Sequence, residues 1–163
     1  MIDGLSNVSI RRFDLDLEQC VAPGTTVFID GTLDGAGWNN IHVSEIEATD
    51  SADDGTCFFF RSRSLSGSHL YIDNVRVTGM GRFVWFKSST DANVHDNIHV
   101  HDNVINNIYN GAFYADSYVE DVYLERNYFN KNSLSNLSTQ HFVLFNNITE
   151  PDTAPRSRRV YVR

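Results

Sequence analysis

A short apolar pattern recurs along the chain and constrains its fold more than any other feature. It has an apolar residue, a second one two positions later, a turn position at plus five and an apolar residue at plus seven. Its six copies begin 33, 29, 28, 24 and 19 residues apart. They are Val8-Ile10-Phe13-Leu15, Ile41-Val43-Ile46-Ala48, Leu70-Ile72-Val75-Val77, Ile98-Val100-Asn103-Ile105, Val122-Leu124-Asn127-Phe129 and, more weakly, His141-Val143-Asn146-Ile148.

Alternation of apolar residues at every second position predicts a strand with one buried face. The step from plus two to plus five breaks this phase, so we expect the chain to bend there and begin another strand. Three successive copies place asparagine at the bend, at Asn103, Asn127 and Asn146. Asparagine suits a bend because it tolerates left-handed backbone and bonds neighbouring backbone groups. Stacked in successive copies, these side chains are expected to form a hydrogen-bonded ladder.

A second apolar segment lies between the copies and follows a glycine. It reads Phe58-Phe59-Phe60 after Gly55, Phe83-Val84-Trp85-Phe86 after Gly81, and Ala112-Phe113-Tyr114-Ala115 after Gly111. Each repeat therefore holds three short strands, and one repeat cannot bury its apolar face without its neighbours. An antiparallel sandwich would need hairpin signals every 8–12 residues or so. The long period favours a stacked solenoid.

Composition agrees with an all-β chain and limits the partners. There are 16 Asn and 15 Asp but only 6 Glu, so turn formers are abundant where helix formers are scarce. The formal net charge of −8 argues against nucleic acid or an anionic membrane as the main partner. Cys20 and Cys57 are isolated, and His99 with His101 offers two ligands without a third, so no metal site is predicted.

Two segments carry a resemblance to a known family. Residues 97–107 (NIHVHDNVINN) and 121–130 (DVYLERNYFN) resemble the rungs of the pectate-lyase-like superfamily. The resemblance implies a right-handed, single-stranded parallel β-helix of about six rungs over residues 1–149. Pro151 and Pro155 end the pattern, so residues 150–163 are expected to be a tail or a terminal strand over Val160–Val162.

Outward side chains of such a fold form columns along the stack, and the first column follows the pattern strand. It places Tyr71, His99, His101 and Tyr123 on one face as candidate substrate-binding residues. Asp73 and Glu125 are expected two strand spacings apart, roughly 9.6 Å. This is near the range of about 6.5–9.5 Å for an inverting glycosidase pair.

The second column follows the glycine-preceded strand, which the resemblance implies is the strand that lines the substrate groove. Phe59, Trp85 and Tyr114 are candidate binding residues, because flat rings suit sugar faces. Arg61, Lys87 and Asp116 are candidate catalytic residues, with Asp116 a Ca²⁺ ligand if the chain is a lyase; otherwise no cofactor is expected. The opposite register, with Phe59 and Trp85 in the core, stays open.

Two functions follow from the resemblance, and a third, a purely structural repeat in a surface protein, stays open. The first is an extracellular or virion-surface module like a phage tailspike, which binds surface polysaccharide and assembles, as a homotrimer or larger, with mainly a structural role. The alternative is a polysaccharide lyase or glycoside hydrolase. The Asn-Thr-Asp, Gly-His-Gly and Arg-Ile-Lys motifs of related hydrolases are absent from the sequence, which favours the first.

Overall fold

The computed structural model is built from β-strands throughout its described part. That part comprises residues 6–16, 25–31, 37–49, 56–62, 67–79, 81–88, 94–108, 111–116, 118–131, 141–145 and 158–163. Within these ranges every regular element is a strand, so the predicted all-β class is confirmed. The strands are β1 (Ser6–Asp16), β2 (Thr25–Gly31), β3 (Asn39–Thr49), β4 (Thr56–Ser62), β5 (Gly67–Asp73), β6 (Arg76–Thr78), β7 (Arg82–Ser88), β8 (Val94–His101), β9 (Val104–Ile108), β10 (Gly111–Asp116), β11 (Tyr118–Glu125), β12 (Tyr128–Lys131), β13 (His141–Phe145) and β14 (Arg158–Val162).

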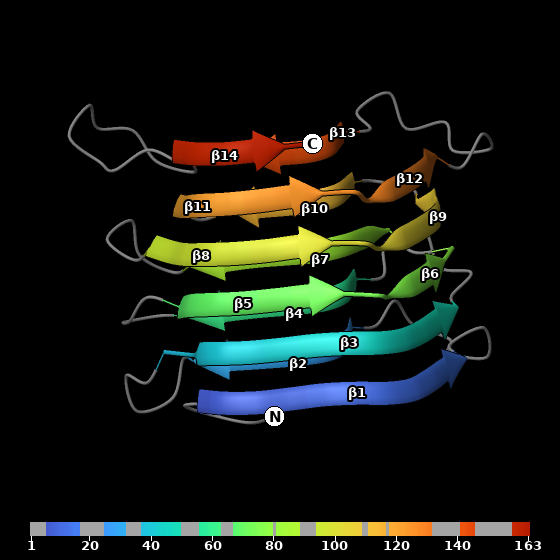
Figure 1. Ribbon diagram of the computed structural model, residues 1–163, viewed down its shortest axis with the longest axis horizontal. Coiled ribbons are helices and arrows are strands. Elements are labelled where there is room, and N and C mark those ends of the chain that lie inside the picture. The colour runs from blue at the N-terminus through green and yellow to red at the C-terminus, as the bar shows by residue number, and fades with distance from the viewer. Residues whose placement is uncertain are drawn as a thin grey trace.

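The larger sheet has nine strands, and all its neighbouring pairs run parallel. The long strand β3 pairs with β1 on one side. On its other side, the first half of β3 pairs with β5, and the order continues through β8, β11 and β14. The second half of β3 pairs with β6, followed by β9 and β12. Figure 1 shows both branches stacked in the front layer, with the smaller sheet behind them.

The register of the larger sheet follows the apolar pattern. Ile41 pairs with Leu70, Leu70 with Ile98, and Ile98 with Val122. These side chains are buried, because like positions of successive strands face the same side of the sheet. The strand expected over Val160–Val162 is present as β14, in parallel register with β11. The division of the chain at residue 149 stays a prediction.

The smaller sheet has the strand order β13-β10-β7-β4-β2, again with parallel pairs. It corrects the prediction for the last repeat. His141–Phe145 is not a sixth copy of the pattern strand, since His141 pairs with Gly111 and Val143 with Phe113. Alternation in so short a segment satisfies either sheet equally well, so the sequence pattern could not choose between them. In the larger sheet, the row that begins with β1, β3, β5, β8 and β11 ends with β14 as its sixth strand instead.

Left-handed backbone marks two bends along the larger sheet. One set of residues precedes the first pattern position: Asn7, Asn40, His69, Asn97, Asp121 and Arg159, with φ between 50° and 58°. The other set lies four positions after the first apolar residue of each pattern copy: Arg12, Glu45, Asn74, Asp102 and Arg126, with φ between 51° and 59°. The left-handed residue is therefore the one before the asparagine of the pattern, which corrects the predicted backbone role of Asn103 and Asn127.

The asparagine ladder itself is confirmed for Asn103 and Asn127, while Asn146 lies outside the described residues. Asn103 is 1% exposed, and its Nδ2 donates to the Ile72 carbonyl at 3.0 Å and to Asn127 Oδ1 at 2.9 Å. The Val75 amide donates to Asn103 Oδ1 at 3.0 Å. Asparagine is needed here because the bend frees buried backbone groups, which must find other partners.

A single apolar cluster joins the two sheets. It combines pattern residues such as Ile72 and Ile98 with Phe86 and Phe113 of the smaller sheet. Trp38, just before β3, packs so closely on Gly67 that a Cβ built there would lie 1.9 Å from Trp38 Cε2. Glycine at position 67 is thus required by the indole.

Candidate functional site

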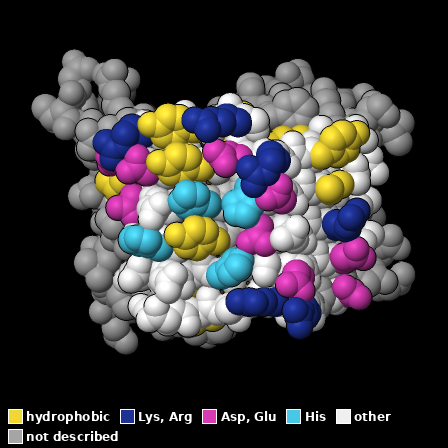
Figure 2. All heavy atoms as spheres, in the orientation of Figure 1, with side chains coloured by type: hydrophobic (Ala, Val, Ile, Leu, Met, Phe, Trp, Pro, Cys, Tyr) yellow, Lys and Arg dark blue, Asp and Glu magenta, His cyan; other side chains and the backbone are white. Residues whose placement is uncertain are grey.

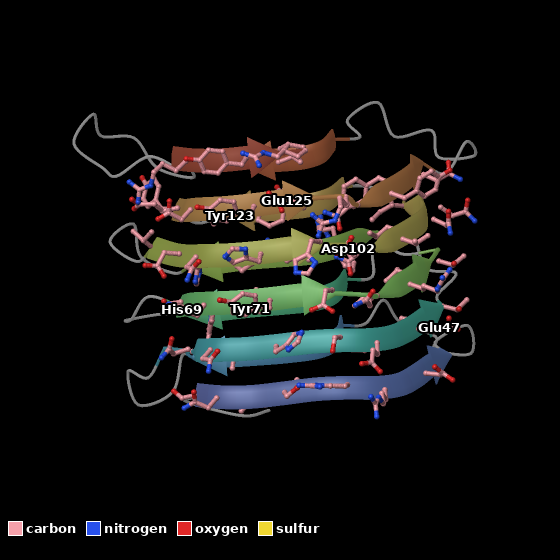
Figure 3. All side chains as sticks on the ribbon, in the orientation of Figure 1. Glu47, His69, Tyr71, Asp102, Tyr123 and Glu125 are labelled. Carbon is pink, nitrogen blue, oxygen red and sulfur yellow. The ribbon has the colours of Figure 1, made fainter. Side chains whose placement is uncertain are left out.

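A row of stacked rings crosses the outer face of the larger sheet. We call it the ladder face: His42, Tyr71, His99, Tyr123 and Tyr161, one from each of β3, β5, β8, β11 and β14. The ring centroids of Tyr71 and His99 are 5.0 Å apart, those of His99 and Tyr123 4.6 Å, and those of Tyr123 and Tyr161 5.0 Å, all within 14° of parallel. Tyr71 and Tyr123 lie one above the other in Figure 3.

The geometry of the ladder face determines which ring atoms a ligand can reach. Because successive rings stack face to face, their faces are largely taken up by one another. The phenol hydroxyls and imidazole nitrogens lie at ring edges, and these groups can donate or accept hydrogen bonds. His42 begins the row differently: its ring is inclined at 71° to that of Tyr71. Its Nε2 lies 2.5 Å from Asp73 Oδ2.

A second column of polar side chains runs beside the rings. The register pairs Asp73 with His101 and His101 with Glu125, so His101 lies between the two carboxylates. The side chains of His101 and Glu125 are 29% and 27% exposed, so both can be reached from solvent. Figure 2 shows histidines gathered at the centre of this face among acidic and basic side chains.

Charge pairs at the bend set the electrostatics of this column. Both guanidinium contacts of Arg126 with the Asp102 carboxylate measure 2.7 Å, and His101 Nδ1 lies 2.8 Å from Asp102 Oδ2. The hydrogen bonds from Arg126 above all, and the one with His101, hold the pKa of Asp102 far below its usual range. Asp102 therefore stays ionised at neutral pH beside the ladder face.

The protonation of His99 is governed by its place inside the ladder. Partial burial lowers its pKa, the neighbouring His101 lowers it further, and Glu125 opposes both by raising it. His99 Nε2 also lies 2.9 Å from Asn97 Oδ1. The imidazole between two phenol rings is thus biased toward its neutral form, which can both donate and accept a hydrogen bond.

Only some side chains of the second predicted column belong to the described part of the structure. Trp85 and Tyr114 are in register, half-buried and edge to face, with centroids 6.0 Å apart. The guanidinium carbon of Arg82 lies 4.7 Å from the centroid of the Trp85 ring and 5.2 Å from that of Tyr114. Neither ring is in the fully buried core, and Arg82 covers part of both.

The charged positions of this column align through their backbones. Arg61 pairs with Lys87, and Lys87 pairs with Asp116, while Phe59 pairs with Trp85. The side chains of Arg61, Lys87, Asp116 and Phe59 lie outside the described part of the structure. Their assigned roles stay predictions, with the backbone register as the one structural fact.

Sequence reasoning missed two members of these groups. Tyr161 completes the ladder face, and its signal was present, because Val160-Tyr161-Val162 repeats the apolar–Tyr–apolar order of Val122-Tyr123-Leu124. Arg82 had no comparable signal, since only the fold carries its guanidinium over the two rings of β7 and β10.

The described residues contain no group of three or more His, Cys, Asp or Glu placed to hold a metal ion. Nor do they include a helix able to cross a membrane.

Comparisons with protein families, curated proteins and solved structures find no match for this chain. The resemblance to the pectate-lyase-like superfamily therefore stays a prediction from the repeat pattern.

Proposed function

We propose that the chain is a right-handed parallel β-helix of about six rungs, related to the pectate-lyase-like superfamily. The support is the order of the strands: β1, β3, β5, β8, β11 and β14 stack in parallel register, with strands of the other sheet between them in sequence. Parallel strands joined by a crossover take the right-handed path in about 98% of cases. Each turn then adds one strand to each stack.

Within this fold, the chain serves as an extracellular or virion-surface module that binds polysaccharide along the ladder face. The observation that carries the proposal is the continuous row of His and Tyr rings with polar edges. Four strand spacings of about 4.8 Å separate the first ring from the last, so the row spans roughly 19 Å. A straight row of repeated donors and acceptors suits a linear polymer of repeated hydroxyl groups better than a compact ligand.

The neighbouring column strengthens this assignment. The Glu125 side chain is 27% exposed and can accept hydrogen bonds, and the adjacent His101 can donate one. Both columns lie on one side of the sheet. Their residues come one and three positions after the first apolar residue of the pattern, and positions two apart in a strand share a face. A glycan chain along the rings would therefore meet the Glu125 carboxylate on one flank. This carboxylate favours hydroxyl-rich sugars over densely anionic ones.

The binding proposal is tested with immobilised bacterial capsular and O-antigen polysaccharides, both neutral and acidic. Tyr71→Ala and Tyr123→Ala should each weaken binding about tenfold or more, the effect of losing a central aromatic contact. Arg12→Asn is the surface control: Arg12 is exposed, pairs only with Glu45 among the described residues, and asparagine tolerates its left-handed backbone. Absence of binding across the panel, or binding that both tyrosine variants retain, would refute the proposal.

The structural role is tested by the state of assembly. A tailspike-like module is expected to form a homotrimer or a larger assembly, with the ladder face left open to glycan. Sedimentation velocity of the intact chain over a concentration series measures this directly. A monomer at every concentration contradicts the assembly part of the proposal.

A polysaccharide lyase is the second candidate, supported by the register of Arg61, Lys87 and Asp116 on adjacent strands. In such a reaction a base removes the sugar C5 proton, the C4–C5 double bond forms, and the glycosidic oxygen leaves from C4. Ultraviolet absorbance of the unsaturated product on uronic-acid polymers, with and without Ca²⁺, tests it. Lys87→Ala and Arg61→Ala should each abolish the signal, and silence across the polymers removes this candidate.

A further inference from the structure

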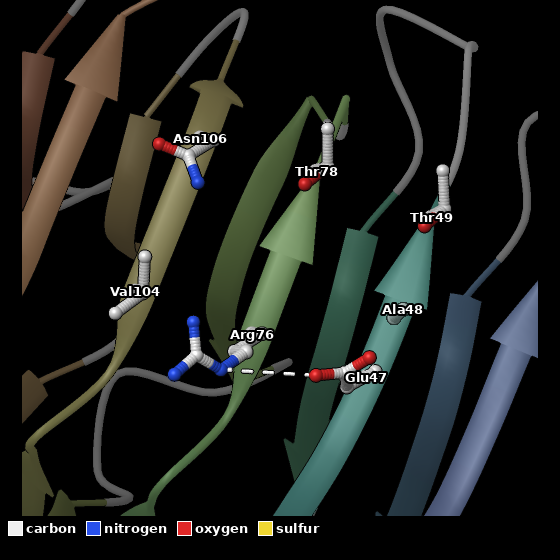
Figure 4. Close-up of a pocket in the computed structure, with 7 residues that line it drawn as sticks. All are labelled: Glu47, Ala48, Thr49, Arg76, Thr78, Val104 and Asn106. Carbon is white, nitrogen blue, oxygen red and sulfur yellow. Dashed lines mark ion pairs between the residues drawn. The ribbon is translucent and has the colours of Figure 1, made fainter.

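A shallow depression lies away from the ladder face, where the second half of β3 meets β6 and β9. Its volume is about 190 Å³. It is lined by Glu47, Ala48, Thr49, Arg76, Thr78, Val104 and Asn106. Figure 4 shows these residues on three adjacent strands, with Arg76 and Glu47 directed toward one another.

Two registered columns supply the polar lining. Glu47 pairs with Arg76, and Thr49 with Thr78, which in turn pairs with Asn106. The intervening residues Ala48, Val77 and Ile105 are buried, so both columns face outward. The depression therefore presents two hydroxyls and an amide, each able to donate and to accept, beside one carboxylate and one guanidinium.

The charged pair is only loosely engaged. Arg76 Nε lies 3.7 Å from Glu47 Oε1, beyond hydrogen-bond distance, and the two side chains are 69% and 67% exposed. Among the described residues neither group has another polar side-chain contact, so the guanidinium N–H groups and the carboxylate oxygens can turn to a ligand. Their charges cancel, and the exposed Asp14 is in register beside Glu47. An anionic ligand is therefore disfavoured.

An exposed ring lies on the next strand beyond the depression. Tyr128 on β12 is in register with Val104, and 58% of its surface is exposed, the largest fraction of any aromatic residue in the described part. Unlike the ladder rings, Tyr128 has no ring partner among the described contacts, so its face is open. A flat apolar face next to mixed donors and acceptors is the combination that a pyranose ring requires, with C–H groups on one face and hydroxyls at its edge.

We propose that this depression binds a single neutral pyranose residue, with Arg76, Thr78 and Asn106 on its hydroxyls and Tyr128 against its ring face. The inference deepens the proposed polysaccharide binding, on which it rests for the choice of a glycan, and adds a site on a separate part of the sheet. A glycan held at both sites would be bound in two places along the module. Binding at the depression does not require the ladder face to be occupied.

The test is an amide ¹H–¹⁵N NMR titration of the full chain with the methyl pyranosides of glucose, galactose and mannose, and with sodium glucuronate as the charged counterpart. At least one neutral glycoside should shift the amides of Thr49, Thr78 and Asn106, and should do so more strongly than glucuronate. Shifts at Tyr71 and Tyr123 report on the ladder face instead. The positions of the shifts thus distinguish failure of this site from failure of the proposed function.

Matched variants then assign the contacts. Thr78→Val keeps the shape and strand propensity but removes the hydroxyl, and it should weaken binding about fivefold or more. Tyr128→Ala should do the same, whereas Tyr128→Phe keeps the ring and retains binding. Arg12→Asn, which removes an exposed guanidinium elsewhere, should bind like the parent chain.

Three results would overturn the inference: no shift at the depression with any of the neutral glycosides, a stronger response to glucuronate, or equal binding by the parent, Thr78→Val and Tyr128→Ala. Each variant is first checked for native amide dispersion. Since all three altered side chains are at least partly exposed, folding is expected to survive.

Discussion

Replacement of Asn103 by leucine tests how the bends are held together. The side chain bridges two buried backbone groups, accepting from the Val75 amide and donating to the Ile72 carbonyl. Leucine of similar size leaves both groups without these partners. Each orphaned buried group costs about 1–3 kcal/mol, so the two together cost about 2–6 kcal/mol.

Burial of the leucine side chain returns part of this loss, up to about 2 kcal/mol. The expected net decrease in the free energy of unfolding is therefore about 3 kcal/mol. Urea denaturation followed by tryptophan fluorescence measures it, since Trp38 and Trp85 both lie in the described strands or next to them. The matched control is Asn39→Leu, the same chemical change at an exposed position, which should alter stability by no more than about 0.5 kcal/mol.

A loss below about 1 kcal/mol at Asn103, or one no larger than that of the control, would refute the reasoning. It would mean that the freed backbone groups are satisfied without the side chain. The variant Asn103→Asp provides a second test of the same hydrogen bonds. A carboxylate can still accept from Val75 but cannot donate to Ile72, so at neutral pH it should lose stability as well, and should recover part of it when acid restores a donor.

Three further predictions concern packing and protonation. Gly67→Ala should lower the free energy of unfolding by about 1–3 kcal/mol, measured by urea denaturation, because the added methyl overlaps the packed indole. Asp102, whose pKa is depressed by Arg126, should stabilise the fold above the ordinary aspartate pKa of about 3.9 and lose that contribution as the pH falls toward its lower folded value; Asp102→Asn should therefore differ from the parent at neutral pH and converge with it in acid. The imidazole of His99 should titrate below about 6.5 in an NMR pH series, and Glu125→Gln should lower that pKa further by removing the group that raises it; an unchanged value would contradict the assigned electrostatics.

Much of the larger sheet was predictable because its signal is local. Alternate apolar residues identify which face of a strand is buried, and five copies of the pattern begin at positions that the structure places in register, from Val8 to Val122. The same alternation placed Tyr71, His99 and Tyr123 together on the outer face. The asparagine ladder was also predictable, because equal spacing within the pattern brings Asn103 and Asn127 to equivalent positions of adjacent bends.

The sequence predictions were wrong where the local apolar pattern is compatible with more than one arrangement. His141–Phe145 alternates like a pattern strand, yet it pairs with β10 in the smaller sheet, and the front stack continues with β14. The left-handed residue was also misplaced: it precedes Asn103 and Asn127, whose side chains turn inward to bond the freed backbone groups.

The sequence by itself therefore determined the strands, their buried faces and the outward position of the ladder rings, since each depends on residues a few positions apart. Only the tertiary structure decided which strands became neighbours, and with that the position of Arg82 over Trp85 and the depression shared by β3, β6 and β9. The physical reason is that alternation selects the buried side of a strand but carries no information about its partner. Partners are chosen by packing and chain connection across the whole fold.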